Sequence, residues 1–314
     1  MKTVSLVIPC FDEAEGLDAL FARLDEALRS CPNHAFEIVC VNDGSRDGTL
    51  DRLVAIAGVR ADTVVVDLSR NFGKEAALSA GLLVATGDAV IPMDADLQDP
   101  PEVIPSLIRR WEEGYEVVVA QRSDRRSDTM SKRVSARWFY RVHNALSDVA
   151  IPENAGDFRL MDRVVVEALN ALPENRRFMK GLFAWIGFRT GTVEYSRTPR
   201  ASGATRFTPW RLWNLALEGI TSFSLLPLRV WTYVGALVAA ASMAWGTFIL
   251  VRTLVYGKDM PGYASLIVAV TFLGGLQLIG IGIIGEYLGR TYMESKRRPA
   301  FVVRKVFPRG TPRA

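Results

Sequence analysis

The segment AVIPMDADLQDPP, residues 89–101, joins an apolar run to two carboxylates that stand one residue apart. The apolar residues predict a strand, and Asp94 and Asp96 follow at its end. In open α/β folds, ligands bind at the carboxyl ends of the strands. Carboxylates suit hard divalent cations such as Mg²⁺ or Mn²⁺, which neutralise nucleotide phosphates. The alternative for this motif alone is a solvated loop made of turn-forming Asp and Pro.

Short β-rich runs alternate with helix-like stretches up to about residue 200. Strands are predicted at Val4–Ile8, Glu37–Val41, Thr63–Leu68, Ala89–Met93 and Glu116–Ala120. Apolar residues at helical spacing lie between them, in Glu15–Arg29, Gly48–Ala57, Lys74–Ala85 and Pro101–Glu113. This alternation predicts an α/β domain over residues 1–200. Its sheet would be mainly parallel and Rossmann-like, with crossover helices on both faces.

The composition narrows the class of protein. Of the 314 residues, 49% are hydrophobic, and the apolar excess is concentrated near the C-terminus. The net charge of +4 is modest, and the basic residues cluster at the ends of apolar runs. We therefore expect a membrane surface and no nucleic acid as partner. The three cysteines lack metal-type spacing and are predicted to be buried free thiols, and the two isolated histidines do not indicate zinc.

Two uncharged runs predict helices that span a membrane. No charged residue occurs between Arg229 and Arg252, or between Asp259 and Glu286. Each run meets the requirement of roughly 20 apolar residues for crossing a bilayer. The predicted helices cover about 230–252 and 264–286, and together with their short linker they form an antiparallel hairpin over residues 229–289.

Basic residues predict the orientation of this hairpin. They precede the first span and follow the second, in a basic tail at residues 290–314, whereas the linker holds few. The positive-inside rule places both termini and the α/β domain in the cytoplasm, at the inner membrane. Residues 201–228 carry Trp at helical spacing, which predicts a helix in the membrane interface. The alternative is a helix packed on the soluble domain.

Two further acidic motifs end the first two predicted strands: PCFDE, residues 9–13, and VNDGS, residues 41–45. Asp43 is placed to accept hydrogen bonds from a base, and Asp12 or Glu13 to hold base or ribose groups. The alternative for the second motif is a turn followed by a helix N-cap. Three acidic clusters at the strand ends of one sheet favour a ligand site.

With GDFRLM, residues 156–161, these motifs resemble the family 2 glycosyltransferases of the GT-A fold. More narrowly, the chain is similar to bacterial polyprenyl-phosphate glycosyltransferases related to dolichol-phosphate mannose synthase, along nearly its whole length. The resemblance implies that Asp94 and Asp96 bind Mg²⁺ or Mn²⁺. It also implies that Asp157 acts with Asp96 in catalysis, as a base or by orienting the acceptor. The alternative for Asp157 is a salt bridge with Arg159 or Arg163.

A nucleoside diphosphate sugar is the implied donor. Lys74 opens a predicted helix and either faces the nucleotide phosphates or is a surface lysine. With it, the expected donor site comprises Pro9, Asp12, Glu13, Asp43, Lys74, Asp94, Ala95, Asp96 and Gln98. The acceptor phosphate needs cations, and Arg suits bidentate contact with phosphate. The expected residues are Arg122, Lys132, Arg137, Arg200 and Arg206, each with a solvated surface charge as the alternative.

The expected reaction is the inverting, metal-dependent transfer of a hexose to polyprenyl phosphate. UDP-glucose and UDP-N-acetylglucosamine are the expected donors, with GDP-mannose as the alternative. A processive polysaccharide synthase is disfavoured because the chain lacks a Gln-x-x-Arg-Trp motif. A non-catalytic membrane scaffold that binds nucleotide sugar is the third possibility. Glycines in the second span permit close helix packing, within the hairpin or in a homo-oligomer.

Overall fold

Four parallel strands form the centre of the sheet, and they are the strands that the sequence predicts most directly. They are β1 (Lys2–Cys10), β2 (His34–Asn42), β3 (Thr63–Leu68) and β4 (Ala89–Pro92). β1 pairs with β2 and β4, and β2 pairs with β3, all in parallel. This computed structural model describes residues 1–122, 155–174, 177, 179–195, 226–257 and 262–308.

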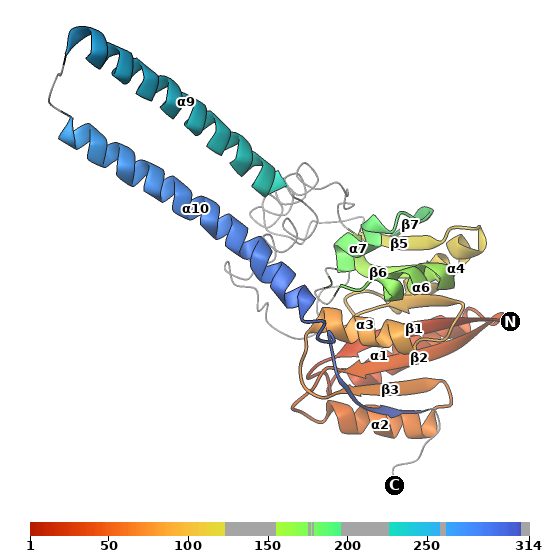
Figure 1. The fold of residues 1–314 in the computed structure, drawn as a ribbon. Coiled ribbons are helices and arrows are strands. Elements are labelled where there is room, and N and C mark those ends of the chain that lie inside the picture. The colour runs from red at the N-terminus through yellow and green to blue at the C-terminus, as the bar shows by residue number, and fades with distance from the viewer. Residues whose placement is uncertain (123–154, 175–176, 178, 196–225, 258–261, 309–314) are drawn as a thin grey trace.

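Helices cover both faces of this sheet (Figure 1). The described helices beside it are α1 (Leu17–Arg29), α2 (Thr49–Val59), α3 (Lys74–Val84), the short η1 (Pro101–Val103), α4 (Ile104–Glu112), α6 (Arg163–Ala171) and α7 (Met179–Trp185). Alternate β1 side chains enter two separate cores: Leu6 packs with residues of α1, α2 and α4, whereas Val7 packs with residues of α3, α6 and α7. The two-sided cover explains why these strands are apolar without alternation.

Three more strands extend the sheet beyond β4, and an eighth, β8 (Val303–Phe307), lies at the opposite edge. The order is β7-β5-β6-β4-β1-β2-β3-β8, with β5 at Val117–Arg122, β6 at Ala155–Asp162 and β7 at Thr190–Tyr195. β6 runs antiparallel to both β4 and β5. An antiparallel strand begins where its parallel neighbours end, so the first residues of β6, including Asp157, lie at the carboxyl edge of β4.

The eighth strand lies within the basic tail expected over residues 290–314. β8 (Val303–Phe307) pairs antiparallel with β3. Arg304 Nη2 donates to the Ser69 carbonyl at 2.6 Å, and Ser69 N donates to the Val302 carbonyl at 2.9 Å. The Arg304 guanidinium also lies 3.5 Å from the carboxylate of Asp67, which is buried. The segment after the second apolar helix is therefore part of the sheet.

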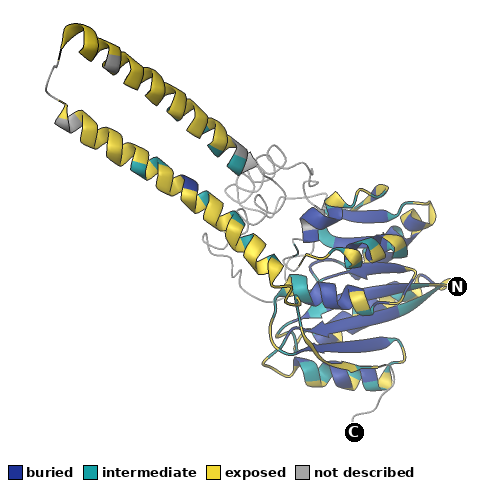
Figure 2. Ribbon diagram, in the orientation of Figure 1, coloured by how far each residue is buried: buried dark blue, intermediate teal, exposed yellow. Residues whose placement is uncertain are grey.

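Two long helices project from the sheet domain and contact each other (Figure 1): α9 (Leu226–Tyr256) and α10 (Tyr263–Ser295). Each is longer than the span expected from the sequence, and both are exposed along their length (Figure 2). In the most apolar window of each helix, 0% of the residues are buried in α9 and 6% in α10. A core helix of a soluble protein would be mostly buried. Exposed apolar surface on this scale marks a surface that contacts lipid or another protein, and length and composition fit a bilayer.

We predict that Arg304 holds β8 on the sheet. Arg304→Gln should speed amide hydrogen exchange across Val303–Phe307, because it removes the hydrogen bond to Ser69 and the charge beside buried Asp67. We expect β8 to lose about 1 kcal/mol of local stability, the usual net worth of one hydrogen bond. Mass spectrometry of exchanged peptides measures this. Lys305→Gln on the same strand is the control, and equal exchange in the two variants would contradict the assignment.

Candidate active site

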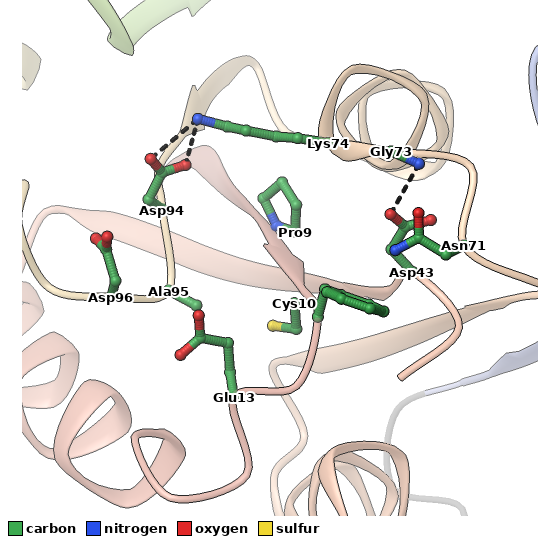
Figure 3. Close-up of a pocket in the computed structure, with 11 residues that line it drawn as sticks. Pro9, Cys10, Glu13, Asp43, Asn71, Gly73, Lys74, Asp94, Ala95 and Asp96 are labelled. Atoms are coloured by element: carbon green, nitrogen blue, oxygen red, sulfur yellow. Dashed lines mark hydrogen bonds and ion pairs between the residues drawn. The ribbon is translucent and has the colours of Figure 1, made fainter. Parts of the chain in front are cut away.

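A cavity of about 260 Å³ lies at the carboxyl edge of the sheet, where β1, β2 and β4 end. Its lining, drawn in Figure 3, is Pro9, Cys10, Phe11, Glu13, Asp43, Asn71, Gly73, Lys74, Asp94, Ala95 and Asp96. Seven of the nine residues expected to hold a donor are in this set. Four carboxylates, those of Glu13, Asp43, Asp94 and Asp96, therefore converge with one lysine on a single pocket.

The two remaining residues of the expected donor set, Asp12 and Gln98, lie beside the lining. Asp12 has a φ of 55° and its Oδ1 accepts a hydrogen bond from Arg46 N at 2.8 Å, so it joins the loops after β1 and β2. Gln98 is buried, and its backbone N donates to Asp96 Oδ1 at 3.1 Å. Both residues are neighbours of the lining, and direct contact with a donor stays a prediction for each.

Asp43 fixes the turn that leads into α3. Its two carboxylate oxygens accept hydrogen bonds from Phe72 N at 2.7 Å and Gly73 N at 2.9 Å. Burial raises the pKa of this carboxyl, against the lowering effect of the two backbone N–H groups. Gly44, next in sequence, has a φ of 65°, and a Cβ there would lie 2.4 Å from the backbone of Arg70. The close packing of these two loops places the start of α3 at the pocket.

Lys74, the first residue of α3, joins two acids from different strands. Its Nζ lies 2.7 Å from Asp94 Oδ1 and 2.8 Å from Asp157 Oδ2 (Figure 3 shows the contact with Asp94). Burial disfavours the ammonium, but Asp157 and Asp94 outweigh it and raise the pKa of Lys74, which is therefore charged at neutral pH. Lys74 is thus not a simple surface lysine.

Lys74 and Arg159 both interact with Asp157. Asp157 forms an ion pair with Lys74. Arg163 donates through Nε to the Gly87 carbonyl at 2.8 Å. Arg159 donates to the Gly156 carbonyl at 2.7 Å and lies 3.9 Å from the centre of the Phe183 ring. Burial lowers the pKa of Arg159 to about 10, while the charge of Asp157 acts in the opposite direction and raises it. Asp157 therefore belongs to the pocket cluster, while its catalytic role stays a prediction.

A buried hydrogen bond anchors the loop that carries Asp94 and Asp96. Tyr195, at the end of β7, donates to Asp99 Oδ1 at 2.5 Å, and both residues are buried. The Tyr195 ring packs edge-on against Phe158 of β6 at 6.0 Å. Between the acids and this anchor, Leu97 has a φ of 56°, a conformation that non-glycine residues rarely adopt. The loop is held in an unusual shape by contacts with β6 and β7.

Sequence reasoning missed four lining residues: Cys10, Phe11, Asn71 and Gly73. The first two lie inside the motif PCFDE, so that motif already held the signal for them. Asn71 and Gly73 precede Lys74 in the segment RNFGKE, whose turn residues mark the end of a strand. The cysteine prediction is confirmed, since Cys10, Cys31 and Cys40 are all buried and free.

Four of the five residues expected at the acceptor phosphate, Lys132, Arg137, Arg200 and Arg206, lie outside the described residues. The same is true of residues 201–225 of the expected interfacial segment. Arg122 is the last residue of β5 and pairs in register with Tyr195, so its backbone lies beside the anchor of the acidic loop. The acceptor site stays a prediction.

Family models match both parts of the chain. The model described as "Glycosyl transferase family 2" matches residues 5–169, more than half of the chain. The chain belongs to glycosyl transferase family 2. The model described as "GtrB C-terminal hairpin" matches residues 226–291, the two long helices. The family assignment confirms the expected resemblance, and the sheet described above is the GT-A fold of this family 2 glycosyltransferase.

Curated relatives cover nearly the full length of this family 2 chain. An uncharacterized glycosyltransferase of Synechocystis sp. is 53% identical over 96% of this chain and 94% of its own. A prophage bactoprenol glucosyl transferase homolog of Escherichia coli is 50% identical over 96% of this chain and 99% of its own. The SfII prophage-derived bactoprenol glucosyl transferase of Shigella flexneri is 52% identical over 98% and 99%. The chain is a membrane-associated glycosyltransferase.

We predict that Asp43→Asn disorders the start of α3. An amide oxygen accepts from one of the two backbone N–H groups, but the amide nitrogen then faces the other. A buried donor left without a partner destabilises by about 1–3 kcal/mol. Thermal unfolding of the detergent-solubilised protein should show this loss, and titration with UDP should show weaker binding. Glu26→Gln, on an exposed part of α1, is the control, and matching melting temperatures would contradict the prediction.

Proposed function

We propose that this protein transfers glucose from UDP-glucose to polyprenyl phosphate, with inversion at the anomeric carbon. One observation carries the proposal: the same chain has an acidic pocket at the ends of its strands and two exposed apolar helices. The names of the Escherichia coli and Shigella relatives support glucose as the sugar and bactoprenol as the carrier. If the acceptor is a lipid, the hairpin would hold the enzyme at the membrane that contains it. A soluble acceptor would not need such an anchor.

We assign a divalent metal, Mg²⁺ or Mn²⁺, to Asp94 and Asp96. Among the residues that the structure describes, no group of three or more His, Cys, Asp or Glu forms a metal cluster. Two carboxylates nevertheless fit, because Mg²⁺ keeps several waters and takes further ligands from substrate phosphates. Asp96 Oδ1 accepts from Gln98 N, which orients this carboxylate at the pocket. When bound, the metal supplies charge neutralisation to the diphosphate leaving group.

The transfer itself is a single displacement. An oxygen of the lipid phosphate forms a bond to the anomeric carbon, and the bond from that carbon to the diphosphate breaks, releasing UDP. The lipid phosphate is already ionised near neutral pH, so it needs little deprotonation. Asp157 then acts chiefly by holding the acceptor and donor in line, and orientation of this kind is a large part of catalysis. The donor would lie on the other side of the reacting carbon, against the pocket residues Asp94, Asp96 and Lys74.

The acceptor phosphate would contact Arg122, Lys132, Arg137, Arg200 and Arg206, since guanidinium groups bind phosphate oxygens in pairs. We place the pocket and both ends of the chain on the cytoplasmic side of the inner membrane, where nucleotide sugars are made. The basic residues before α9 and after α10 support this orientation. Contacts between transmembrane helices of different copies remain part of the proposal, since α10 carries exposed glycines.

Lipid-dependent release of UDP tests the proposal. The purified full chain in detergent, supplied with UDP-glucose and Mg²⁺ or Mn²⁺, should release UDP only when a short-chain polyprenyl phosphate is added. UDP-N-acetylglucosamine and GDP-mannose are run in parallel. Stronger lipid-dependent turnover of either would change the assigned sugar. No lipid-dependent turnover of any donor would favour a binding scaffold over a transferase.

We predict that Asp96→Asn lowers kcat by at least about 100-fold, because it weakens the hold on the metal that would neutralise the negative charge developing on the diphosphate. The amide oxygen can still accept from Gln98 N, so the loop and the melting temperature should be preserved. Initial rates at saturating UDP-glucose and lipid measure the loss, with Glu26→Gln as control. Unchanged turnover would remove Asp96 from the mechanism.

We also predict that chelation abolishes turnover. Treatment with EDTA should stop lipid-dependent UDP release, because Asp94 and Asp96 would then face the donor diphosphate as bare anions. Added Mg²⁺ or Mn²⁺ should restore the rate. Activity that persists after exhaustive dialysis against EDTA would argue for a metal-independent reaction in which Lys74 supplies the positive charge.

A further inference from the structure

The Lys74 ammonium lies between two carboxylates of the proposed donor pocket. It contacts Asp94 Oδ1 at 2.7 Å and Asp157 Oδ2 at 2.8 Å, so it joins β4 and β6 across the pocket. Two carboxylates this near one point repel each other unless a positive charge lies between them. The ammonium meets that need, and it uses an oxygen of the same Asp94 that is expected to bind metal.

The backbone that carries Lys74 is fixed, and its side chain is partly exposed. Gly73 N donates to Asp43 Oδ2 at 2.9 Å, which pins the residue before Lys74. The Lys74 side chain is 43% exposed, whereas that of Asp157 is 14% exposed. Lysine carries a compact charge on a flexible stem with four carbons. A change of rotamer would therefore move the ammonium within the pocket without moving α3.

We propose that Lys74 is an exchangeable counter-charge that holds Asp94 and Asp157 before the donor binds and then transfers to the donor diphosphate. This inference rests on the proposed function, because it takes a metal-bound nucleoside diphosphate as the ligand. Lys74 lines the same cavity as Asp94 and Asp96, so the diphosphate that those acids reach through a metal is also within reach of the ammonium. Once Lys74 has turned to the diphosphate, Asp94 is released to the metal.

The exchange makes metal binding and nucleotide binding depend on each other. Without nucleotide, a metal must displace Lys74 from Asp94, which weakens metal binding. A nucleotide that draws Lys74 away removes that competition, so each ligand strengthens the other. Such coupling is reciprocal, and it typically amounts to about 5–150-fold in affinity. The direct contact between metal and diphosphate adds to this coupling, but only the Lys74 part depends on residue 74.

Mn²⁺ binding to the full chain in detergent, without nucleotide, tests the first half of the exchange. The free Mn²⁺ signal in electron paramagnetic resonance measures it without any turnover. We expect Lys74→Gln to bind Mn²⁺ about 10-fold more tightly than the unmodified protein, because the competing charge is gone. Lys74→Arg keeps the charge and should bind as weakly as the unmodified protein. Lys305→Gln, on exposed β8, is the matched control and should change nothing.

UDP binding at saturating Mn²⁺, measured by titration calorimetry, tests the second half. Lys74→Gln should bind UDP about 10-fold more weakly, since the diphosphate loses its ammonium partner. Lys74→Met, with a stem of similar length, is a second variant should the first lower the melting temperature. Unchanged or weaker Mn²⁺ binding in both variants would contradict the proposal that Lys74 competes with the metal for Asp94. Unchanged UDP binding would contradict the proposal that Lys74 moves to the diphosphate. Failure of the unmodified protein to bind UDP would instead refute the proposed function.

Discussion

Acidic side chains from different strands meet at one edge of the sheet, and this concentration of negative charge requires a positive partner. Asp94 lies two residues after β4 and Asp157 is the third residue of the antiparallel β6, so the sheet order itself brings the two carboxylates together. Lys74 reaches both acids from the start of α3, and Asp43 holds the turn just before it. The order of the strands places the two acids, the packing of the loops places Lys74, and the charge of Lys74 balances the acids, so the three features depend on one another. The proposed site for a metal-bound diphosphate would meet the same need, because the metal would replace Lys74 as the positive partner of Asp94.

The strands β1 to β4 were predictable because they are buried on both faces, which leaves uninterrupted apolar runs that end in acidic motifs. The position of β6 was not predictable. It lies between β4 and β5 through pairing with residues far away in the sequence, which its own residues do not encode. For that reason the sequence offered Arg159 and Arg163, its near neighbours, as partners of Asp157. Lys74, which forms an ion pair with Asp157, is 83 positions away. The pocket lining was predictable wherever a motif ended a strand.

β8 shows a different limit of sequence reasoning. The segment VRKVF is short and basic, and its charges follow an apolar helix, so it fits the pattern of a positively charged flank. Both properties hold at once: basic side chains on an edge strand also prevent pairing with other chains. The strand is specified by the open edge of β3 and by Arg304, whose partner Ser69 is 235 positions away. No local pattern contains that information.

The connection from α10 to β8 also ties the second long helix to the sheet that carries the pocket. α10 has 33 residues, about 50 Å of helix, whereas the hydrocarbon core of a bilayer is about 30 Å thick. Its last turns, from Glu286 onward, carry charges and extend toward the sheet domain (Figure 1). The N-terminus lies on the side of the sheet remote from the helices, so the carboxyl ends of the parallel strands face the helices. In the proposed reaction the lipid phosphate would stay at the membrane interface, and the end of the sheet that carries the pocket is the end that faces the helices.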